Sequence, residues 1–205
     1  MGLNPILIPA ILIAITIHEF SHGYIAYKCG DPTAKLSGRL TLNPIPHFDL
    51  IGTTMLFLVG FGWAKPVPVN FMNLNNPKRD IVLVAAAGPA SNFILAFLLA
   101  KIFTFFNIGY VNPQSWVGVF AKLMIATIQI NIVLAWFNLL PLYPLDGFRI
   151  LSGLLPYRYN NIISFLEYYG PFLFIGIILF SYLTGMRIIG AVLFPLVNAT
   201  LNLFL

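Results

Sequence analysis

Charged residues are scarce in this chain of 205 residues, at 8%, whereas 59% of its residues are apolar. Soluble globular domains average about 25% charged and roughly 45 to 50% apolar residues. The shortage of charge therefore excludes a soluble globular protein. The 11 basic and 6 acidic residues leave a net charge of +5, but the basic residues are spread over short segments and form no basic face. Nucleic acid is therefore excluded as a partner.

Cysteine is nearly absent as well. The single cysteine, Cys29, excludes an intramolecular disulfide and a metal site built from several thiolates. The first apolar segment lacks a basic start and a small-residue cleavage site, so we expect it to be retained and not removed as a signal peptide. Linkers, low-complexity tracts and internal repeats are also missing. These absences predict a single membrane-embedded domain over residues 1–205.

The chain contains instead a series of long segments without charge. They cover residues 1–17, 81–100, 102–121, 123–145, 168–186 and 188–205. A hydrocarbon core of ~30 Å takes about 20 residues of helix to cross. We therefore predict an all-α polytopic membrane protein with about five transmembrane helices. The expected helices run over about residues 5–28, 81–106, 116–141, 161–184 and 187–205.

The segment between the first two spans has a different character. Proline and glycine recur between residues 33 and 80, polar and apolar residues alternate over 35–42, and Pro-Val-Pro-Val follows at 66–69. These features predict a small insert of strands and loops at about 33–80. The apolar run at 51–64 is short for a span and contains three glycines. We expect it to be a re-entrant or interfacial element.

The positions of the basic residues predict the orientation in the membrane. If residues 51–64 do not cross, the six Lys and Arg residues between 28 and 79 lie on the same face as Arg149 and Arg158. Only Arg187 then lies plainly on the other face. Because basic connectors stay in the cytoplasm, we predict an N-terminus outside and a C-terminus inside, in the cell (inner) membrane.

The first predicted helix carries the pattern His18-Glu19-Phe20-Ser21-His22. Residues four apart lie on one helix face, about 5 to 6 Å from each other, so both imidazoles can bind one Zn²⁺. Glu19, beside the first histidine, can then act as the general base toward a zinc-activated water. The alternative is a set of polar residues that only make hydrogen bonds inside the bundle. Ionisable residues within a membrane are usually functional, which favours the metal site.

A catalytic zinc ion needs a third protein ligand. Of the six acidic residues, Asp31, Asp80 and Glu167 lie at span ends, where solvated or capping roles suffice. Asp146 follows an apolar stretch broken by two prolines, and Gly147 permits a tight turn after it. Asp146 is therefore the predicted third ligand. The alternative is an exposed aspartate at a helix end.

Two motifs together resemble the site-2 protease family of intramembrane zinc metalloproteases. They are HEFSH in the first span and NLLPLYPLDG near the end of a later one. Three further segments, GRLTLNPIPHFD, FGWAKPVPVN and AAAGPASN, are similar to compact bacterial and archaeal members without PDZ or CBS modules. The resemblance covers most of residues 10–155. Tyr143 departs from it, because proline is common at that place in the motif.

The resemblance implies roles for five residues. His18, His22 and Asp146 would hold one zinc ion per chain, and Glu19 would be the general base. Asn138 would bind the substrate or the oxyanion.

Three other polar residues have open roles. His47 and Asp49 lie in the insert, where an imidazole is more often a local hydrogen-bonding group than a ligand. If Asp146 were not the third ligand, one of these two would have to be considered. Asn92 could face the site or form an interhelical hydrogen bond beside small residues that pack closely.

The expected function is that of a zinc-dependent endopeptidase that cleaves transmembrane segments of membrane proteins. Its partners would be a transmembrane substrate and the lipid bilayer, with room for a regulatory membrane partner. The active site would open toward the cytoplasmic side, and an unwound substrate could pair with a strand edge of the insert. A metal-ion transporter and a membrane scaffold that does not cleave are the alternatives. Neither needs a glutamate next to the first histidine.

Overall fold

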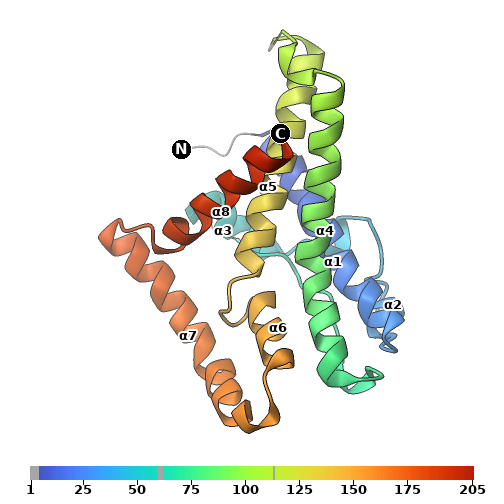
Figure 1. The fold of residues 1–205 in the computed structure, drawn as a ribbon, viewed down its shortest axis with the longest axis vertical. Helices are drawn as coiled ribbons and strands as arrows, with labels where there is room; N and C mark the ends of the chain where they lie inside the picture. Colours follow the sequence, from blue (N-terminus) through green and yellow to red (C-terminus); the bar gives the residue numbers. More distant parts are fainter. Residues whose placement is uncertain (1–4, 60–61, 113) are drawn as a thin grey trace.

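The computed structural model describes residues 5–59, 62–112 and 114–205, and all regular secondary structure within them is helical (Figure 1). The α-helices are α1 (Leu7–Lys28), α2 (Thr33–Leu36), α3 (Leu50–Val59), α4 (Pro77–Phe105), α5 (Trp116–Asn138), α6 (Asp146–Leu154), α7 (Asn160–Thr184) and α8 (Ile188–Phe204). Short 3₁₀ turns lie at Ile45–His47, Phe71–Asn73, Ile108–Tyr110 and Tyr157–Tyr159. The predicted all-α fold class is confirmed.

Four of these helices are long and apolar enough to cross a membrane, namely α1, α4, α5 and α7. The fifth predicted span, α8, has 17 residues, and at 1.5 Å per residue its length is about 25 Å. It is therefore shorter than a hydrocarbon core of ~30 Å. The described residues thus contain four helices of full membrane-spanning length and one shorter apolar helix.

Helices α1, α4 and α5 form the centre of the molecule, and α4 and α5 run side by side for most of their length (Figure 1). The buried faces of all three are rich in alanine. They include Ala10, Ala14 and Ala26 on α1, Ala85, Ala96 and Ala100 on α4, and Ala121, Ala126 and Ala135 on α5. Small residues let membrane helices approach closely. Close approach is what allows short polar side chains to meet between these helices.

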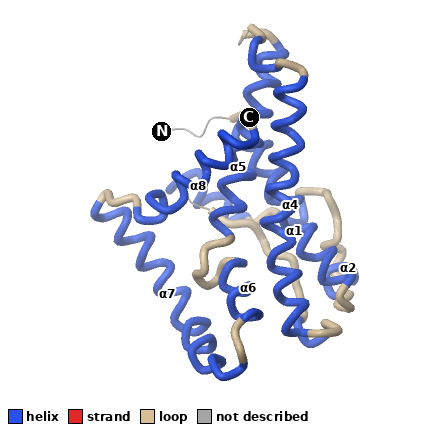
Figure 2. Tube along the Cα trace, viewed as in Figure 1, coloured by secondary structure: helices blue, strands red, loops and turns tan. Residues whose placement is uncertain are grey.

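The insert contains no β-strand within its described residues, so the predicted strands are wrong (Figure 2). The alternating segment at 35–42 begins inside α2, and Gly38, at φ +65°, turns the chain directly afterwards. Pro66 and Pro68 have no N–H to give to a neighbouring strand. The N–H of Val67, between them, donates to the Glu19 carboxylate. Residues 66–68 therefore offer no N–H to a neighbouring strand.

Asp31 attaches the insert to the end of α1. Its side chain is completely buried. The carboxylate accepts hydrogen bonds from the backbone N–H of Thr33 at 3.1 Å and of Asn70 at 2.7 Å, and from Asn73 Nδ2 at 2.9 Å. Asp31 lies at the end of a span, as predicted, but it is buried and not solvated, and its carboxylate accepts hydrogen bonds from the insert.

The apolar run predicted to be re-entrant contains α3, whose 10 residues rise only about 15 Å. That length is too short for a span, as expected. Residues 60 and 61 of the run lie outside the described part of the chain.

The chain between α5 and α6 differs from the sequence prediction. The fourth apolar segment was expected to stay helical to about residue 141, but α5 ends at Asn138 and a new helix, α6, begins at Asp146. A Cβ on Gly147 would lie 2.2 Å from the backbone oxygen of Leu139. Only glycine therefore allows α6 to return so close to the end of α5.

Candidate metal centre

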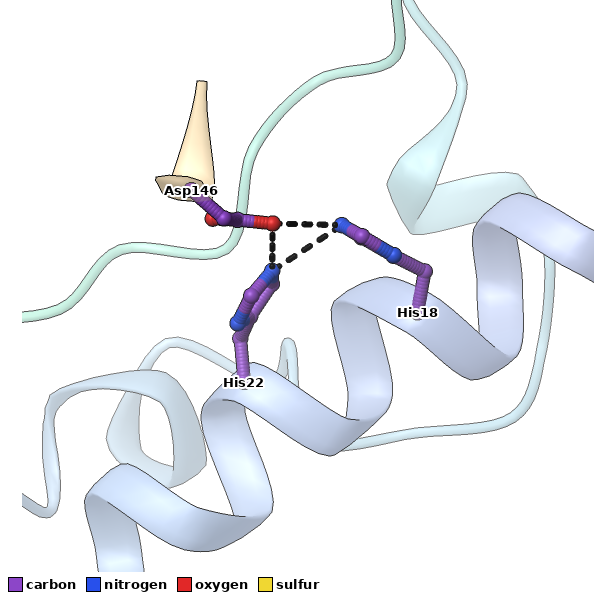
Figure 3. Close-up of side chains that lie close together, drawn as sticks. All are labelled: His18, His22 and Asp146. Carbon is purple, nitrogen blue, oxygen red and sulfur yellow. Dashed lines mark hydrogen bonds and ion pairs between the residues drawn. The ribbon is translucent and has the colours of Figure 1, made fainter. Parts of the chain in front are cut away.

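Three side chains, His18 and His22 of α1 and Asp146 at the start of α6, converge (Figure 3). Oδ2 of Asp146 lies 3.1 Å from Nε2 of His18 and 3.2 Å from Nε2 of His22, and the two Nε2 atoms are 3.0 Å apart. In a tetrahedral zinc site with ligands at about 2.0 to 2.1 Å, neighbouring ligand atoms lie roughly 3.3 Å apart. The triangle therefore has nearly the dimensions that a zinc ion requires.

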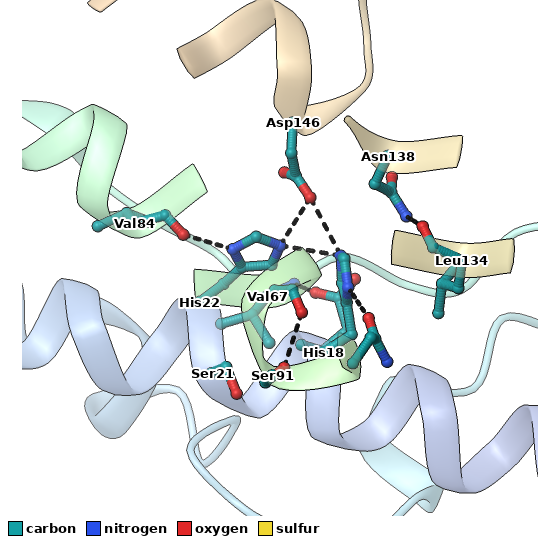
Figure 4. A network of polar contacts seen from close by, with 12 residues as sticks. His18, Ser21, His22, Val67, Val84, Ser91, Leu134, Asn138 and Asp146 are labelled. Atoms are coloured by element: carbon teal, nitrogen blue, oxygen red, sulfur yellow. Dashed lines mark hydrogen bonds and ion pairs between the residues drawn. The ribbon is translucent and has the colours of Figure 1, made fainter. Parts of the chain in front are cut away.

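The protons on the two imidazoles point away from this triangle. Nδ1 of His22 lies 2.7 Å from the carbonyl oxygen of Val84, which can only accept, so Nδ1 carries the hydrogen. Nδ1 of His18 lies 2.6 Å from Oδ1 of Asn92. Neutral rings of this kind turn their Nε2 lone pairs toward Asp146 (Figure 4).

The triangle is consequently a cluster of acceptors. Oδ2 of Asp146 is buried and accepts no hydrogen bond although it faces both rings. Three acceptor atoms at this separation repel one another unless a cation lies between them. Two imidazoles and a carboxylate are also a common ligand set of catalytic zinc sites. The lone pairs of these three atoms therefore fit a divalent metal ion as ligands.

Helix α4 approaches the two imidazoles closely, and Gly88 makes this approach sterically feasible. A Cβ at this position would lie 2.4 Å from Nε2 of His22 and 2.6 Å from Cε1 of His18. Any side chain would therefore have to displace a ring. Sequence reasoning treated Gly88 only as a small packing residue, and its proximity to the metal centre was missed.

Glu19 lies in the same cavity as the three converging residues. The cavity has a volume of about 150 Å³ and is also lined by Asn138 and Arg149. Oε2 of Glu19 accepts the backbone N–H of Val67 at 2.7 Å, and Oε1 stays available. The insert thus holds the Glu19 carboxylate in the cavity that the three candidate metal ligands also line.

Asn138 also lines this cavity, as the last residue of α5. The sequence placed it inside a helix, but it lies at the helix end. Its Nδ2 donates to the carbonyl of Leu134 at 3.0 Å (Figure 4). An amide nitrogen carries two hydrogens, so one donor remains for another acceptor.

His47 and Asp49 lie away from the converging triangle and do not belong to the cluster of possible ligands among the described residues. Nε2 of His47 lies 2.9 Å from the carbonyl oxygen of Thr41, and Asp49 accepts the N–H of Gly52 at 2.7 Å. Both contacts are local to the insert. The structure therefore supports Asp146 over either of them as the third candidate ligand.

Asn92 answers one question that the sequence left open. It is completely buried on α4 and contacts both His18 and Asn131 of α5. It therefore combines the two roles that were considered, contact with the site and an interhelical hydrogen bond. Asn131 itself was missed, although an asparagine in an apolar run was the available signal.

Comparison with known proteins decides the family. The model of Peptidase family M50 matches residues 6–124 and 107–179. The chain belongs to peptidase family M50. The resemblance to site-2 proteases is thereby confirmed.

Several curated relatives support the assignment of this M50 peptidase. YwhC of Bacillus subtilis is 41% identical over 203 residues, which cover 97% of this chain and 89% of the relative. Rip2 of Mycobacterium tuberculosis H37Rv is 32% identical over 157 residues, covering 74% of this chain and 58% of Rip2. The names of both assign them provisionally to the zinc metalloproteases.

A third relative, zinc metalloprotease MJ0392 of Methanocaldococcus jannaschii, is 27% identical over 154 residues, covering 75% of this chain and 35% of that protein. No solved structure matches the chain. The family of this M50 peptidase and its four long apolar helices indicate that it is a multi-pass membrane protein.

Proposed function

We propose that this M50 peptidase is a zinc-dependent intramembrane endopeptidase of the HExxH type, which cleaves transmembrane segments of membrane proteins. The observation that carries the proposal is the triangle of acceptor atoms from His18, His22 and Asp146, with Glu19 in the same cavity. The curated relatives with zinc metalloprotease names support the choice of metal and reaction.

The position of the triangle supports cleavage within the membrane. Counting back from Lys28, the last residue of α1, His22 and His18 lie about 6 to 10 residues into the helix. At 1.5 Å per residue this corresponds to roughly 9 to 15 Å below the membrane surface. A peptide bond that reaches this depth belongs to a transmembrane segment or to the chain next to one.

The residues of the site divide the chemistry between them. A bound zinc ion supplies Lewis-acid activation of the scissile carbonyl and of water. Glu19 takes the proton from the attacking water and passes it to the leaving amine. The second N–H of the Asn138 amide would donate to the substrate carbonyl oxygen as that oxygen gains charge.

An apolar cavity of about 650 Å³ supports the proposal that the substrate is an apolar segment. It lies between α1, the insert and α5, and its lining includes Thr16 and Phe137. These residues lie two positions before His18 and one position before Asn138, on the same two helices as the candidate site.

The cleavage of a single-span model substrate by purified enzyme in detergent tests the proposal. Glu19→Gln should keep zinc bound and lose cleavage, because the amide keeps the shape of the carboxylate but cannot act as a base. The other glutamate of the chain, Glu167, is exposed on α7 and provides the matched control. Glu167→Gln should cleave at the wild-type rate, and near-wild-type cleavage by Glu19→Gln would reject the mechanism.

A further inference from the structure

A chain of buried amides connects the candidate metal centre to the backbone of α5. Nδ1 of His18 lies 2.6 Å from Oδ1 of Asn92, and Nδ2 of Asn92 donates to Oδ1 of Asn131 at 2.7 Å. Nδ2 of Asn131 in turn donates to the carbonyl of Thr127 at 2.8 Å. Both asparagines are completely buried. The chain therefore joins α1, α4 and α5 without contact with solvent.

The two ends of this chain fix the direction of every hydrogen bond in it. The carbonyl of Thr127 can only accept, so Asn131 must turn its NH₂ toward it and its oxygen toward Asn92. Asn92 must then donate to Asn131, and its other N–H donates to the carbonyl of Ala14 at 3.0 Å. Both hydrogens of the Asn92 amide are thus used.

Only an oxygen of Asn92 is left to face His18. That oxygen cannot donate, so the hydrogen between the two groups belongs to Nδ1 of His18. A neutral imidazole with its hydrogen on Nδ1 has its lone pair on Nε2. Nε2 is the atom that lies 3.1 Å from Oδ2 of Asp146.

We infer that Asn131 is a positioning residue of the candidate metal centre: together with the carbonyl of Ala14, it holds the Asn92 amide in the orientation that selects the Nδ1–H tautomer of His18 and so keeps Nε2 free to bind a metal ion. The inference rests on the metal centre of the proposed function, but its tests measure metal binding and need no proteolysis. Failure of cleavage and failure of this inference are therefore distinguishable.

His22 has no such chain, because the backbone carbonyl of Val84 fixes its tautomer directly. The amide of Asn92 could flip, but two neighbours oppose the flipped state. In that state the amide oxygen would face the carbonyl oxygen of Ala14 and Oδ1 of Asn131, and the hydrogen bonds to both would be lost.

The competing role for Asn131 is purely structural, a hydrogen bond that ties α4 to α5. In that case its loss should lower the melting temperature but leave the zinc affinity of the folded protein unchanged. Zinc affinity, measured by competition with a chelator in detergent, is therefore the decisive readout, with the melting temperature recorded for every variant.

Four variants form the test. Asn92→Leu should weaken zinc binding by about 10- to 100-fold, the usual effect of losing a hydrogen-bond partner of a metal-binding histidine. Asn131→Leu should weaken it by about tenfold. The double variant should bind zinc no more weakly than Asn92→Leu, since Asn131 acts through Asn92. Asn198→Leu, an exposed asparagine on α8, is the matched control and should keep wild-type affinity.

A rescue variant separates positioning from packing. Asn92→Asp places a carboxylate next to His18, which accepts the Nδ1 hydrogen in either orientation. In this background Asn131→Leu should no longer weaken zinc binding. If Asn131→Leu does not fold, Asn131→Ser replaces it, because a serine hydroxyl can still donate to Thr127 but is shorter than the amide. Wild-type zinc affinity of the folded Asn131 variants, or multiplying effects in the double variant, would overturn the inference.

Discussion

At the scale of a single residue, Gly88 leaves room for the two imidazoles of the candidate metal centre because it has no side chain. The two imidazoles fill the space that a Cβ would need. We expect Gly88→Ala to displace a ring and to reduce bound zinc and cleavage together. Zinc stoichiometry on the purified variant is the measurement.

The control for this variant is Gly176→Ala on α7, where a Cβ would meet no atom within 4 Å. Alanine is the better helix former at both positions by about 0.8 to 1 kcal/mol, so helix propensity cannot account for a loss at position 88. Full zinc occupancy in Gly88→Ala would contradict the predicted displacement.

Asn138 carries the second prediction at this scale. Asn138→Ala should lower the turnover rate by about 10²-fold or more, as with other oxyanion donors, while the zinc content stays unchanged. Turnover, zinc stoichiometry and melting temperature are measured on one preparation. A parallel loss of stability and activity would instead indicate that Asn138 stabilises the C-terminal end of α5, where its amide donates a hydrogen bond to the carbonyl of Leu134.

Predictions from the sequence agree best with the structure where they concern residues that are close together in the chain. His18 and His22 lie one helical turn apart, so their shared face follows from helical periodicity alone. Asp146 required elimination among six acidic residues, which was feasible because so few exist. The contacts of Asn92 with His18 and Asn131 could not be predicted, because they depend on how three helices are rotated and shifted against one another.

At the scale of elements, the prediction succeeded for the long helices and failed for the insert and for α6. Period-two alternation indicates a strand only if a partner strand is available. Here Pro66 and Pro68 have no N–H, and the N–H of Val67 is taken by Glu19, so residues 66–68 have none for a partner strand. Helix α6 was missed because its 9 residues follow two prolines directly, where a turn was expected.

Asp31 supports a prediction about the insert. Burial raises the pKa of its carboxyl group, but the hydrogen bonds from Thr33, Asn73 and Asn70 outweigh this and lower the pKa below its ordinary value. A lowered pKa contributes stability that is complete above the unfolded-state value of about 3.9 and is lost as the pH falls through the lower folded value. Thermal unfolding between pH 7 and pH 2 should show this loss.

The substitution Asp31→Asn should remove this part of the pH dependence. It should also destabilise the insert by about 1.5 to 3 kcal/mol, the value of hydrogen bonds to a charged group. Limited trypsin cleavage of the insert at pH 7 is the second measurement. Asp49→Asn, which alters an aspartate with a single contact to Gly52 in the same insert, serves as the control and should leave the cleavage pattern nearly unchanged.

At the scale of the whole molecule, the orientation in the membrane is the prediction to test. In a Cys29→Ser background, Lys35→Cys and Lys78→Cys should react with an impermeant thiol reagent only from the cytoplasmic side. Arg187→Cys should react only from the outside. Labelling of either lysine position from outside would reject the proposed orientation of the active site.

The hydrogen bond from the N–H of Val67 to Glu19 connects the proposed general base to the insert. A carboxylate is a stronger acceptor than its protonated form, so Glu19 should hold Val67 most firmly before it takes a proton and less firmly while it carries one. The insert would then loosen during the bond-breaking step and tighten again when the amine product leaves. In each turnover the wall of the cavity would thus loosen only while Glu19 carries the proton.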